Sequence, residues 1–470
     1  MELKKGQDIE LEIHSTAYKG KGVGRVDGLA VFVPNTVPGD TVKARIIKRK
    51  KNHCEAKLLE VVKGGSRRIE PRCRHAKNCG GCSWQHVDYQ SQLEFKRNQV
   101  RDHMERIGGL KELDIKPTIA CPEPFYYRNK MEYSIGHKRW LSREEIERDE
   151  YVSDRCFAAG LHAPGRFDKI LNLQECHLQH PISYQILDFV RTYCTERDIP
   201  PYNTIDNEGF MRNVMIRNAY HTDDLMVNLV TYRDEQEVMK PMADALREQF
   251  PQVTTIVNNI NDTKSPTAVG RYEHILYGPG HIIDKIGGHR FTIDANAFFQ
   301  TNTRQAERLY EVAHSYADLT PDELLFDLYC GVGTLSLFMS DSVTKVVGIE
   351  NVKVAVKNAR TNAEENGVEN VEFVKGDMRD VFDQSLISRY GKPDCIITDP
   401  PRAGMHPDVV SHLKNLEVSK LVYVSCNSST MARDLKELQE VYDILEVQPV
   451  DMFPQTYHIE TVANLRLKDL

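Results

Sequence analysis

A cysteine in the C-terminal part of the chain stands where a nucleophile could form. Cys426 follows an apolar, strand-like run at 420–425 and precedes a helix-like stretch that starts at Ser428. The N-terminus of a helix carries partial positive charge, which lowers the pKa of a nearby thiol and raises its thiolate content. Cys395, inside another apolar run, is expected to be an inert, buried cysteine. Cys426 is therefore predicted to be a nucleophile.

The segment 451–460 reads DMFPQTYHIE and is rich in groups that could bind or move protons. Pro454 interrupts regular structure, so we expect a loop between the last two strands. His458 and Glu460 are both candidates for a general base, and the pattern alone does not choose between them.

The segment 327–334 reads DLYCGVGT and lies between a strand-like run and a helix-like run, and the next strand-like run ends in Glu350. Gly331 and Gly333 let the backbone approach a ligand, and Glu350 could accept both hydroxyls of a ribose. The third glycine of a dinucleotide fingerprint is absent, so the pattern favours S-adenosylmethionine over a cofactor with a pyrophosphate. A tight turn of purely structural use is the alternative. Asp377, after the third strand-like run, could reach the adenine amino group.

The fourth strand-like run leads into Asp399-Pro400-Pro401-Arg402. Two prolines cannot continue a central strand or a helix, so a rigid loop is predicted at the active edge of the sheet. An ordinary strand-ending turn is the alternative, but the flanking carboxylate and guanidinium favour a functional loop.

Three cysteines occur within ten residues, at Cys73, Cys79 and Cys82. Zinc and iron-sulfur clusters both use grouped thiolates, and a fourth ligand must come from elsewhere in the chain. Candidates from the sequence are Cys121, Cys156 and Cys176.

The elements that position these groups fall into three regions. Residues 6–62 alternate apolar and polar residues between glycine-rich turns and predict a five-strand barrel. A helix is predicted from about Asp88 to Ile107, with Leu93, Val100, Met104 and Ile107 on its apolar stripe. Lys96, Arg97 and Arg101 are expected on a solvated face, phosphate contact being the alternative. Residues 120–290 mix strands and helices, with an exposed insertion expected at 137–155. From 291 onward, strands alternate with helices, which is typical of a doubly wound parallel sheet.

Length and charge limit the classes of function. The 470 residues are enough for about three domains, and an apolar run of the roughly 20 residues that a bilayer requires is absent from the sequence, so a cytoplasmic protein is expected. Residues 1–110 hold 22 Lys and Arg against 13 Asp and Glu, whereas the rest of the chain is acidic. A polyanionic partner of the basic part, which includes the run Lys48 to Lys51, would explain this difference. Solvated lysines around a small barrel explain it equally well.

Taken together, the motifs resemble those of the bacterial RNA (uracil-C5)-methyltransferases, and among them the 23S ribosomal RNA enzymes of the RlmD type. The resemblance runs nearly end to end. It rests on the N-terminal barrel, C-x5-C-G-G-C, DLYCGVGT, DPPRAG, VYVSCN and the terminal DMFPxTxHIE pattern. It implies an α/β protein with an OB-like TRAM β-barrel at 1–63, a central α+β domain with an iron-sulfur cluster at 64–290, and a Rossmann-like methyltransferase domain at 291–470.

The resemblance also implies roles for particular residues. Cys426 would be the nucleophile and Glu460 the base, with His458 in support. A [4Fe-4S] cluster would be held by Cys73, Cys79, Cys82 and Cys176. S-adenosylmethionine would be bound by Gln300, Tyr329, Thr334, Glu350, Asp377 and Asp399. The implied substrate is a uridine of 23S ribosomal RNA, which must leave its stack to reach the site.

Three other functions compete with this prediction. A transfer RNA uracil-C5 methyltransferase would have the same catalytic half. A non-catalytic RNA-binding or assembly protein would have no use for Cys426 and Glu460 together. A radical S-adenosylmethionine methylthiotransferase also combines a TRAM barrel with a cluster, but it requires C-x3-C-x2-C, which the spacing of Cys73, Cys79 and Cys82 excludes.

Overall fold

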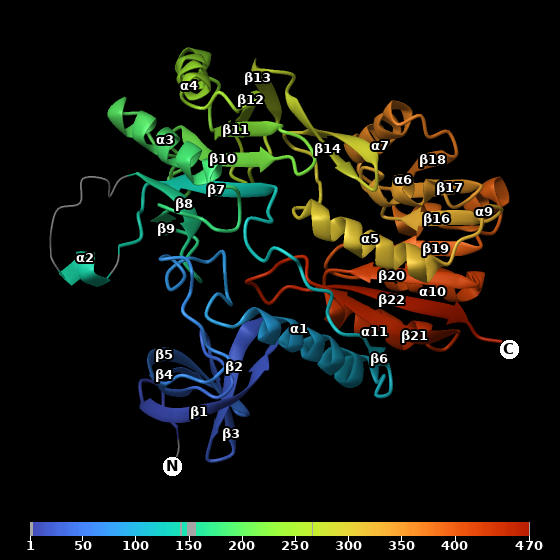
Figure 1. The fold of residues 1–470 in the computed structure, drawn as a ribbon, viewed down its shortest axis with the longest axis horizontal. Coiled ribbons are helices and arrows are strands. Elements are labelled where there is room, and N and C mark those ends of the chain that lie inside the picture. Colours follow the sequence, from blue (N-terminus) through green and yellow to red (C-terminus); the bar gives the residue numbers. More distant parts are fainter. Residues whose placement is uncertain (1–2, 142, 148–156, 266, 470) are drawn as a thin grey trace.

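A small closed barrel begins the fold. The computed structural model describes residues 3–141, 143–147, 157–265 and 267–469, and in it the barrel strands are ordered β1-β2-β3-β5-β4 (Figure 1). Their bounds are β1 Asp8–Ala17, β2 Lys21–Val26, β3 Leu29–Val33, β4 Thr41–Arg49 and β5 His53–Lys63. Alternate residues such as Ile13, Val31 and Val42 fill the interior. The predicted five-strand barrel is confirmed, and the basic run 48–51 lies at the exposed β4–β5 hairpin.

Helix α1 (Tyr89–His103) follows the barrel and ends in one π-helical turn, Met104–Gly108. Asp88 caps it by accepting a hydrogen bond from the N–H of Ser91 at 2.9 Å. The prediction that Lys96 faces solvent is wrong, because its side chain is fully buried. Lys96 lies three residues after Leu93 and four before Val100, which places it on the buried stripe of the helix.

The central region is built on a seven-strand sheet with the order β13-β12-β11-β10-β7-β8-β9. Its strands are β7 Lys130–Gly136, β8 Ala158–His162, β9 Ile170–Asn172, β10 Met211–Asn218, β11 Leu225–Thr231, β12 Thr255–Ile260 and β13 Tyr272–Tyr277. Helices α3 (Ile182–Glu196) and α4 (Gln236–Gln249) pack against it, and their apolar residues share one core with the sheet. Of the expected insertion at 137–155, the structure describes α2 (Arg143–Glu147), whereas residues 142 and 148–156, including Cys156, lie outside the described residues.

An eight-strand sheet forms the C-terminal region, in the order β18-β17-β16-β19-β20-β22-β21-β6. The strands are β6 Asp114–Ile115, β16 Leu324–Leu328, β17 Lys345–Glu350, β18 Val371–Lys375, β19 Cys395–Thr398, β20 Lys420–Ser425, β21 Tyr442–Val450 and β22 Glu460–Leu467. The first five strands in this order are parallel and β22 is antiparallel to both of its neighbours, which confirms the predicted doubly wound sheet.

Helices cover both faces of this sheet (Figure 1). Successive strand residues point to opposite sides, so Leu325 joins the core with α5 (Thr303–Ala317), α6 (Thr334–Ser340) and α7 (Lys353–Glu365), whereas Phe326 joins the core on the other face. That second core includes residues of α8 (Met378–Val381), α9 (Gln384–Tyr390), α10 (Pro407–Leu416) and α11 (Ser428–Leu438). A hairpin of β14 (His281–Ile286) and β15 (His289–Asp294) precedes α5.

The segment after the barrel belongs to the C-terminal sheet by its packing. Val100 and Met104 of α1 lie in the same core as α11, and β6 (Asp114–Ile115) pairs in parallel with β21 and forms the edge of the sheet. The region numbered 64–290 is therefore divided between two sheets. Among the described residues, no helix combines the length and the apolarity that crossing a bilayer requires.

Candidate functional site

Four of the predicted cofactor residues line one pocket at the carboxyl ends of the parallel strands. These are Gln300, Tyr329, Thr334 and Asp399. Thr334 begins α6, and its hydroxyl lies 2.8 Å from the hydroxyl of Tyr310. Tyr329 has a positive φ of 68°, a conformation that residues other than glycine rarely adopt, so the chain turns sharply between β16 and α6.

The other two predicted cofactor carboxylates stand at the ends of neighbouring strands. Glu350 ends β17 and accepts hydrogen bonds from the N–H groups of Gly331 at 3.1 Å and Val352 at 2.7 Å. Asp377 follows β18, and its hydrogen-bonded ion pair with Arg379 lowers the pKa of Asp377 to about 2. The pocket loop itself therefore orients Glu350, whereas Asp377 is engaged by Arg379.

A buried carboxyl group borders the same pocket. Ser336 donates a hydrogen bond to one oxygen of Asp327 at 2.5 Å, and the other oxygen, Oδ1, has no hydrogen-bond partner among the described residues. Burial raises the pKa values of Asp327 and Asp399 to about 7. An orphaned acceptor and two carboxyl groups suit a ligand that brings positive charge. The residues present thus fit S-adenosylmethionine, which carries a sulfonium and an ammonium group.

Cys426 lies between β20 and α11, as the sequence predicts, and is half-buried. Burial raises the pKa of its thiol to about 11, with further contributions from Glu460 and Asp399, while Arg402 opposes the rise. The prediction of a lowered pKa is therefore wrong for the free protein. Desolvation and the two carboxyl groups outweigh the helix N-terminus and the guanidinium.

The loop that carries Arg402 is fixed to the helix behind Cys426. The side-chain amide of Asn427 donates to the carbonyl oxygen of Arg402 at 3.0 Å, and the hydroxyl of Thr430 donates to the same oxygen at 3.4 Å. The predicted rigid loop after β19 is thus held against α11. This attachment keeps the Arg402 guanidinium, whose charge lowers the pKa of the thiol, near Cys426.

Glu460 is the first residue of β22 and lies opposite the end of β20. Burial, followed by the charge of Asp399, raises its pKa well above the ordinary value, and Arg402 opposes this rise. The pKa of His458 is lowered to about 4 by burial and by three nearby cations, so its imidazole is neutral at pH 7. Of the two candidate bases, Glu460 is the one whose charge acts on the Cys426 thiol.

The thiols of the predicted cluster lie near one another. Burial and then the charges of Cys79, Cys176 and Cys73 together raise the pKa of Cys82 to about 12. Cys79 accepts a hydrogen bond from the N–H of Gly81 at 3.3 Å. Among the described residues, no group of three or more His, Cys, Asp or Glu side chains is arranged to hold a metal ion. Cys121, a candidate from the sequence, belongs instead to a network around Asp451 and Asn302.

Similarity to known proteins covers nearly the whole chain. Residues 218–468 match the tRNA (uracil-5-)-methyltransferase family and residues 2–59 match the TRAM domain. An uncharacterized RNA methyltransferase of Chlorobaculum tepidum is 41% identical over 465 residues, which cover 98% of this chain and 96% of that protein. An uncharacterized RNA methyltransferase of Bacteroides thetaiotaomicron is 40% identical over 455 residues, 96% of this chain and 100% of that protein. The chain belongs to the RNA (uracil-5)-methyltransferase family.

The fold of this RNA methyltransferase is also similar to that of a solved structure. The tRNA (uracil-54, C5)-methyltransferase of Pyrococcus abyssi, in complex with S-adenosyl-L-homocysteine, is 28% identical with a TM-score of 0.76. The alignment covers 97% of this chain and 100% of that one. The predicted α/β methyltransferase fold with an N-terminal TRAM barrel, S-adenosylmethionine as cofactor and RNA as substrate are thereby confirmed.

The methyltransferase also contains a buried ion pair that sequence reasoning missed. The ammonium group of Lys96 lies 2.5 Å from a carboxylate oxygen of Asp451, and both side chains are completely buried. Tyr89 donates to the other oxygen of Asp451 at 2.9 Å, and Lys96 donates to the carbonyl oxygen of Phe453 at 3.1 Å. A signal was present in the sequence, because Tyr89 and Lys96 are seven residues apart on the apolar stripe of α1. The ion pair fastens the start of the 451–460 loop to that helix.

The same loop is bonded to the cysteine segment. The N–H groups of Ser83 and Trp84 donate to the carbonyl oxygen of Gln455 at 2.9 and 3.0 Å. The indole N–H of Trp84 donates to the carbonyl oxygen of Gly20 in the barrel at 3.3 Å. The methyltransferase thus joins its barrel, its cysteine segment and the loop that ends at Glu460 through a few hydrogen bonds.

Proposed function

We propose that this enzyme methylates C5 of a specific uridine in 23S ribosomal RNA, with Cys426 as the nucleophile and Glu460 as the base. The observation that carries the proposal is the group formed by Cys426, Glu460, Asp399 and Arg402, whose charges act on one another at the edge of the catalytic sheet. The resemblance of the chain as a whole to the RlmD type supports ribosomal RNA as the substrate, whereas the catalytic motifs would be shared with a transfer RNA enzyme.

The chemistry of uracil explains why such a group is needed. C5 of uracil is too weakly nucleophilic to take a methyl group directly. In the proposed reaction, Cys426 and Glu460 first give up their protons to solvent water when the substrate binds. The Cys426 thiolate then adds to C6, the electron pair of the C5–C6 double bond moves toward O4, and C5 becomes nucleophilic. Bound S-adenosylmethionine would supply an electrophilic methyl group to C5 and leave as S-adenosylhomocysteine. The Glu460 carboxylate then removes the C5 proton, the double bond re-forms, and the bond from C6 to sulfur breaks, which releases Cys426 as its thiolate.

The cofactor contacts are proposed residue by residue. Glu350, already oriented by two N–H groups, would accept from the ribose hydroxyls. Gln300, Tyr329, Thr334 and Asp399 would line the cavity that holds the rest of the cofactor, and Asp377 would approach the adenine. We also propose the division into domains at 1–63, 64–290 and 291–470, with α1 and β6 of the central part packed on the C-terminal sheet.

A [4Fe-4S] cluster on Cys73, Cys79, Cys82 and Cys176 forms part of the proposal. It is supported by the mutual effect of the four thiols on their pKa values and by N–H donors directed at sulfur, from Gly81 to Cys79 and from Gln85 to Cys82. Protein purified without oxygen should contain about four irons per chain. The variant Cys176→Ala should lose them, whereas Cys156→Ala should retain them. One zinc and no iron in such a preparation would contradict the assignment.

A transfer RNA substrate is the second candidate. The Pyrococcus abyssi enzyme, which covers nearly the whole chain, is a tRNA methyltransferase, and this observation favours the alternative. The test is transfer of labelled methyl groups from S-adenosylmethionine to protein-free 23S ribosomal RNA and to transfer RNA, followed by mapping of the modified base. 5-Methyluridine in ribosomal RNA alone is the expected result, and 5-methyluridine in transfer RNA alone would favour the second candidate. Transfer to neither RNA would contradict the proposed function.

A further inference from the structure

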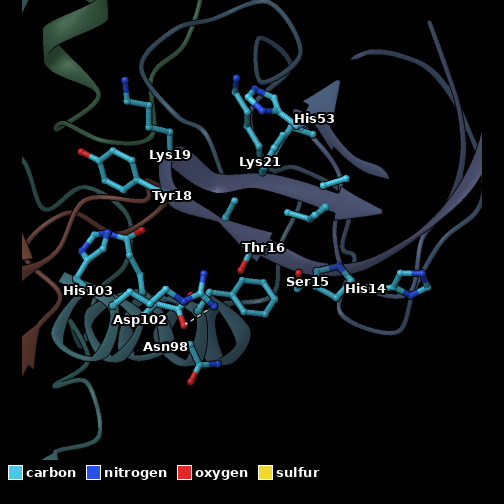
Figure 2. Close-up of a pocket in the computed structure, with 18 of the residues that line it drawn as sticks. His14, Ser15, Thr16, Tyr18, Lys19, Lys21, His53, Asn98, Asp102 and His103 are labelled. Atoms are coloured by element: carbon cyan, nitrogen blue, oxygen red, sulfur yellow. Dashed lines mark ion pairs between the residues drawn. The ribbon is translucent and has the colours of Figure 1, made fainter. Parts of the chain in front are cut away.

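A large groove separates the barrel from helix α1. Its volume is about 990 Å³, and its walls come from β1, β2, β3 and β5 on one side and from α1 on the other. Figure 2 shows Tyr18 of the barrel and His103 of α1 at one end of this groove and His14 at the other. The proposed chemistry takes place outside the groove and does not use these residues.

The Tyr18 end of the groove leads to the reacting groups. The ring of Tyr18 contacts the ring of His103 at 5.4 Å and that of Tyr457 at 6.3 Å, and Tyr457 stacks on His458 at 4.3 Å. His103 Nδ1 lies 2.8 Å from the hydroxyl of Ser428, two residues after Cys426. A ligand in the groove therefore ends next to the two segments that carry Cys426 and Glu460.

The charges of the groove suit a polyanion. Its three carboxylates are already matched by cations, in the ion pairs Lys21–Glu55, Arg67–Glu94 and Arg106–Asp102. Lys19, whose ammonium group lies 5.8 Å from the centre of the Tyr18 ring, and Arg25 add further positive charge. Lys48 and Lys50 lie near enough to Glu55, which lines the groove, for their charges to lower its pKa. The basic hairpin therefore lies beside the same groove.

The rings of the groove suit unpaired bases. Tyr18 is 48% exposed although it touches two other rings, so part of its surface is free to take a base. Phe32 and His53 form a second aromatic pair on the barrel wall, at 5.3 Å. Proteins that hold single-stranded nucleic acid combine a cationic groove with such aromatic surfaces, because every base can stack. In a duplex the faces of the bases are covered by neighbouring bases, so an aromatic side chain cannot stack on them.

We infer that the groove between the barrel and α1 holds a single-stranded stretch of the RNA next to the target uridine, with Tyr18 as a stacking platform at its catalytic end. This inference rests on the proposed function, since it assigns the path of the same substrate. It also explains how the target base reaches the pocket, because a flanking strand that is already unstacked lowers the cost of splaying the uridine.

Binding of a fluorescein-labelled oligouridylate of 12 nucleotides tests the inference. Tyr18→Ala should weaken binding of the oligouridylate roughly tenfold, because the variant lacks the ring on which a base would stack. Tyr18→Phe, which keeps the ring, should bind as the wild type does. Tyr272→Ala is the matched control, because Tyr272 is 47% exposed and lies on β13, far along the chain in the central sheet. An abasic oligomer of the same length should bind equally to wild type and Tyr18→Ala.

Photocrosslinking locates the strand directly. An oligouridylate that contains 4-thiouridine should crosslink to Tyr18 or His103. Equal binding by wild type and Tyr18→Ala, crosslinks confined to other regions, or preference for a 12-base-pair duplex would each overturn the inference. These measurements need no methyl transfer. If wild type methylates no RNA, the proposed function fails while the binding and crosslinking results still decide the path of the strand.

Discussion

The two halves of the catalytic edge differ in how ready they are before any ligand arrives. On the cofactor half, Glu350 accepts from two backbone N–H groups and Thr334 pairs with Tyr310, so the polar groups already have fixed orientations. On the reacting half, the pKa values of Cys426 and Glu460 are both raised, by burial above all, and the charge of Asp399, which lines the cofactor pocket, raises both further. The cofactor side is preorganised, whereas the reacting side stays in its neutral, unreactive form.

This difference has a chemical consequence. A thiolate and a carboxylate held side by side in the free enzyme would repel each other, and burial adds a further cost to each charge. Protonated groups avoid both costs. Because only the thiolate is nucleophilic, a Cys426 thiol with a raised pKa reacts slowly with other electrophiles at neutral pH. We expect bound substrate to change the surroundings of the site and so to make the thiolate accessible. The predictions below test whether the two halves are as separate as the geometry indicates.

The largest effect should come from removing the proposed nucleophile. Cys426→Ala should reduce methyl transfer by at least about a thousandfold, since the variant lacks the thiol that is proposed to add to C6. Its affinity for S-adenosylmethionine, measured by calorimetry, should match that of the wild type, because Cys426 belongs to the reacting half. Turnover near the wild-type rate would exclude the covalent mechanism, and loss of cofactor binding would show that the two halves are not separate.

Glu460→Gln should stop turnover at a later step. Addition and methylation precede removal of the C5 proton, so this variant should accumulate a covalent complex with RNA that survives denaturing electrophoresis. The double variant Cys426→Ala/Glu460→Gln is the control and should form none. If Glu460→Gln turns over normally while His458→Ala forms the covalent complex, the base is His458.

Loss of the buried ion pair should disturb the reacting half more than the cofactor half. Lys96→Met leaves Asp451 charged, buried and unpaired, which costs on the order of 3–5 kcal/mol of unfolding free energy and loosens the loop that leads to Glu460. Denaturant titration and methyl-transfer kinetics measure the two effects. The double variant Lys96→Met/Asp451→Asn removes both charges and should regain part of the stability. The exposed residue Lys111 gives the control Lys111→Met, for which no change is expected. Wild-type stability of Lys96→Met would show that the ion pair does not hold the loop.

Patterns of local sequence were enough to predict the elements that carry the site. The strand-loop-helix at 327–334, the strand that ends in Glu350 and the position of Cys426 before α11 all follow from apolar runs and from turn residues. The five barrel strands were predictable for the same reason, since alternation and glycine-rich turns are local signals.

What the sequence did not predict depends on contacts between distant segments. The pKa of Cys426 is raised by burial first of all and then by Glu460 and Asp399, against Arg402, and these groups come from two other segments, so the neighbouring helix terminus alone gave the wrong direction. Lys96 was misassigned because its partner, Asp451, lies 355 residues away in the chain. The pairing of β6 with β21 was missed for the same reason, since a strand of two residues has no pattern of its own.

The smallest expected effect concerns the pH dependence of the thiol. Because the pKa of Cys426 is raised to about 11, its thiolate fraction should rise about tenfold per pH unit between pH 7 and 9, and alkylation of Cys426 by iodoacetamide should follow it. Arg402 opposes the raised pKa, so Arg402→Met should raise the pKa further and slow alkylation several-fold at pH 8, while Lys111→Met should not change it. Peptide mass spectrometry separates Cys426 from the other cysteines. Alkylation that is already maximal at pH 7 would mean that the thiolate exists in the free enzyme. The reacting half would then be as preorganised as the cofactor half, and the contrast between them would fail.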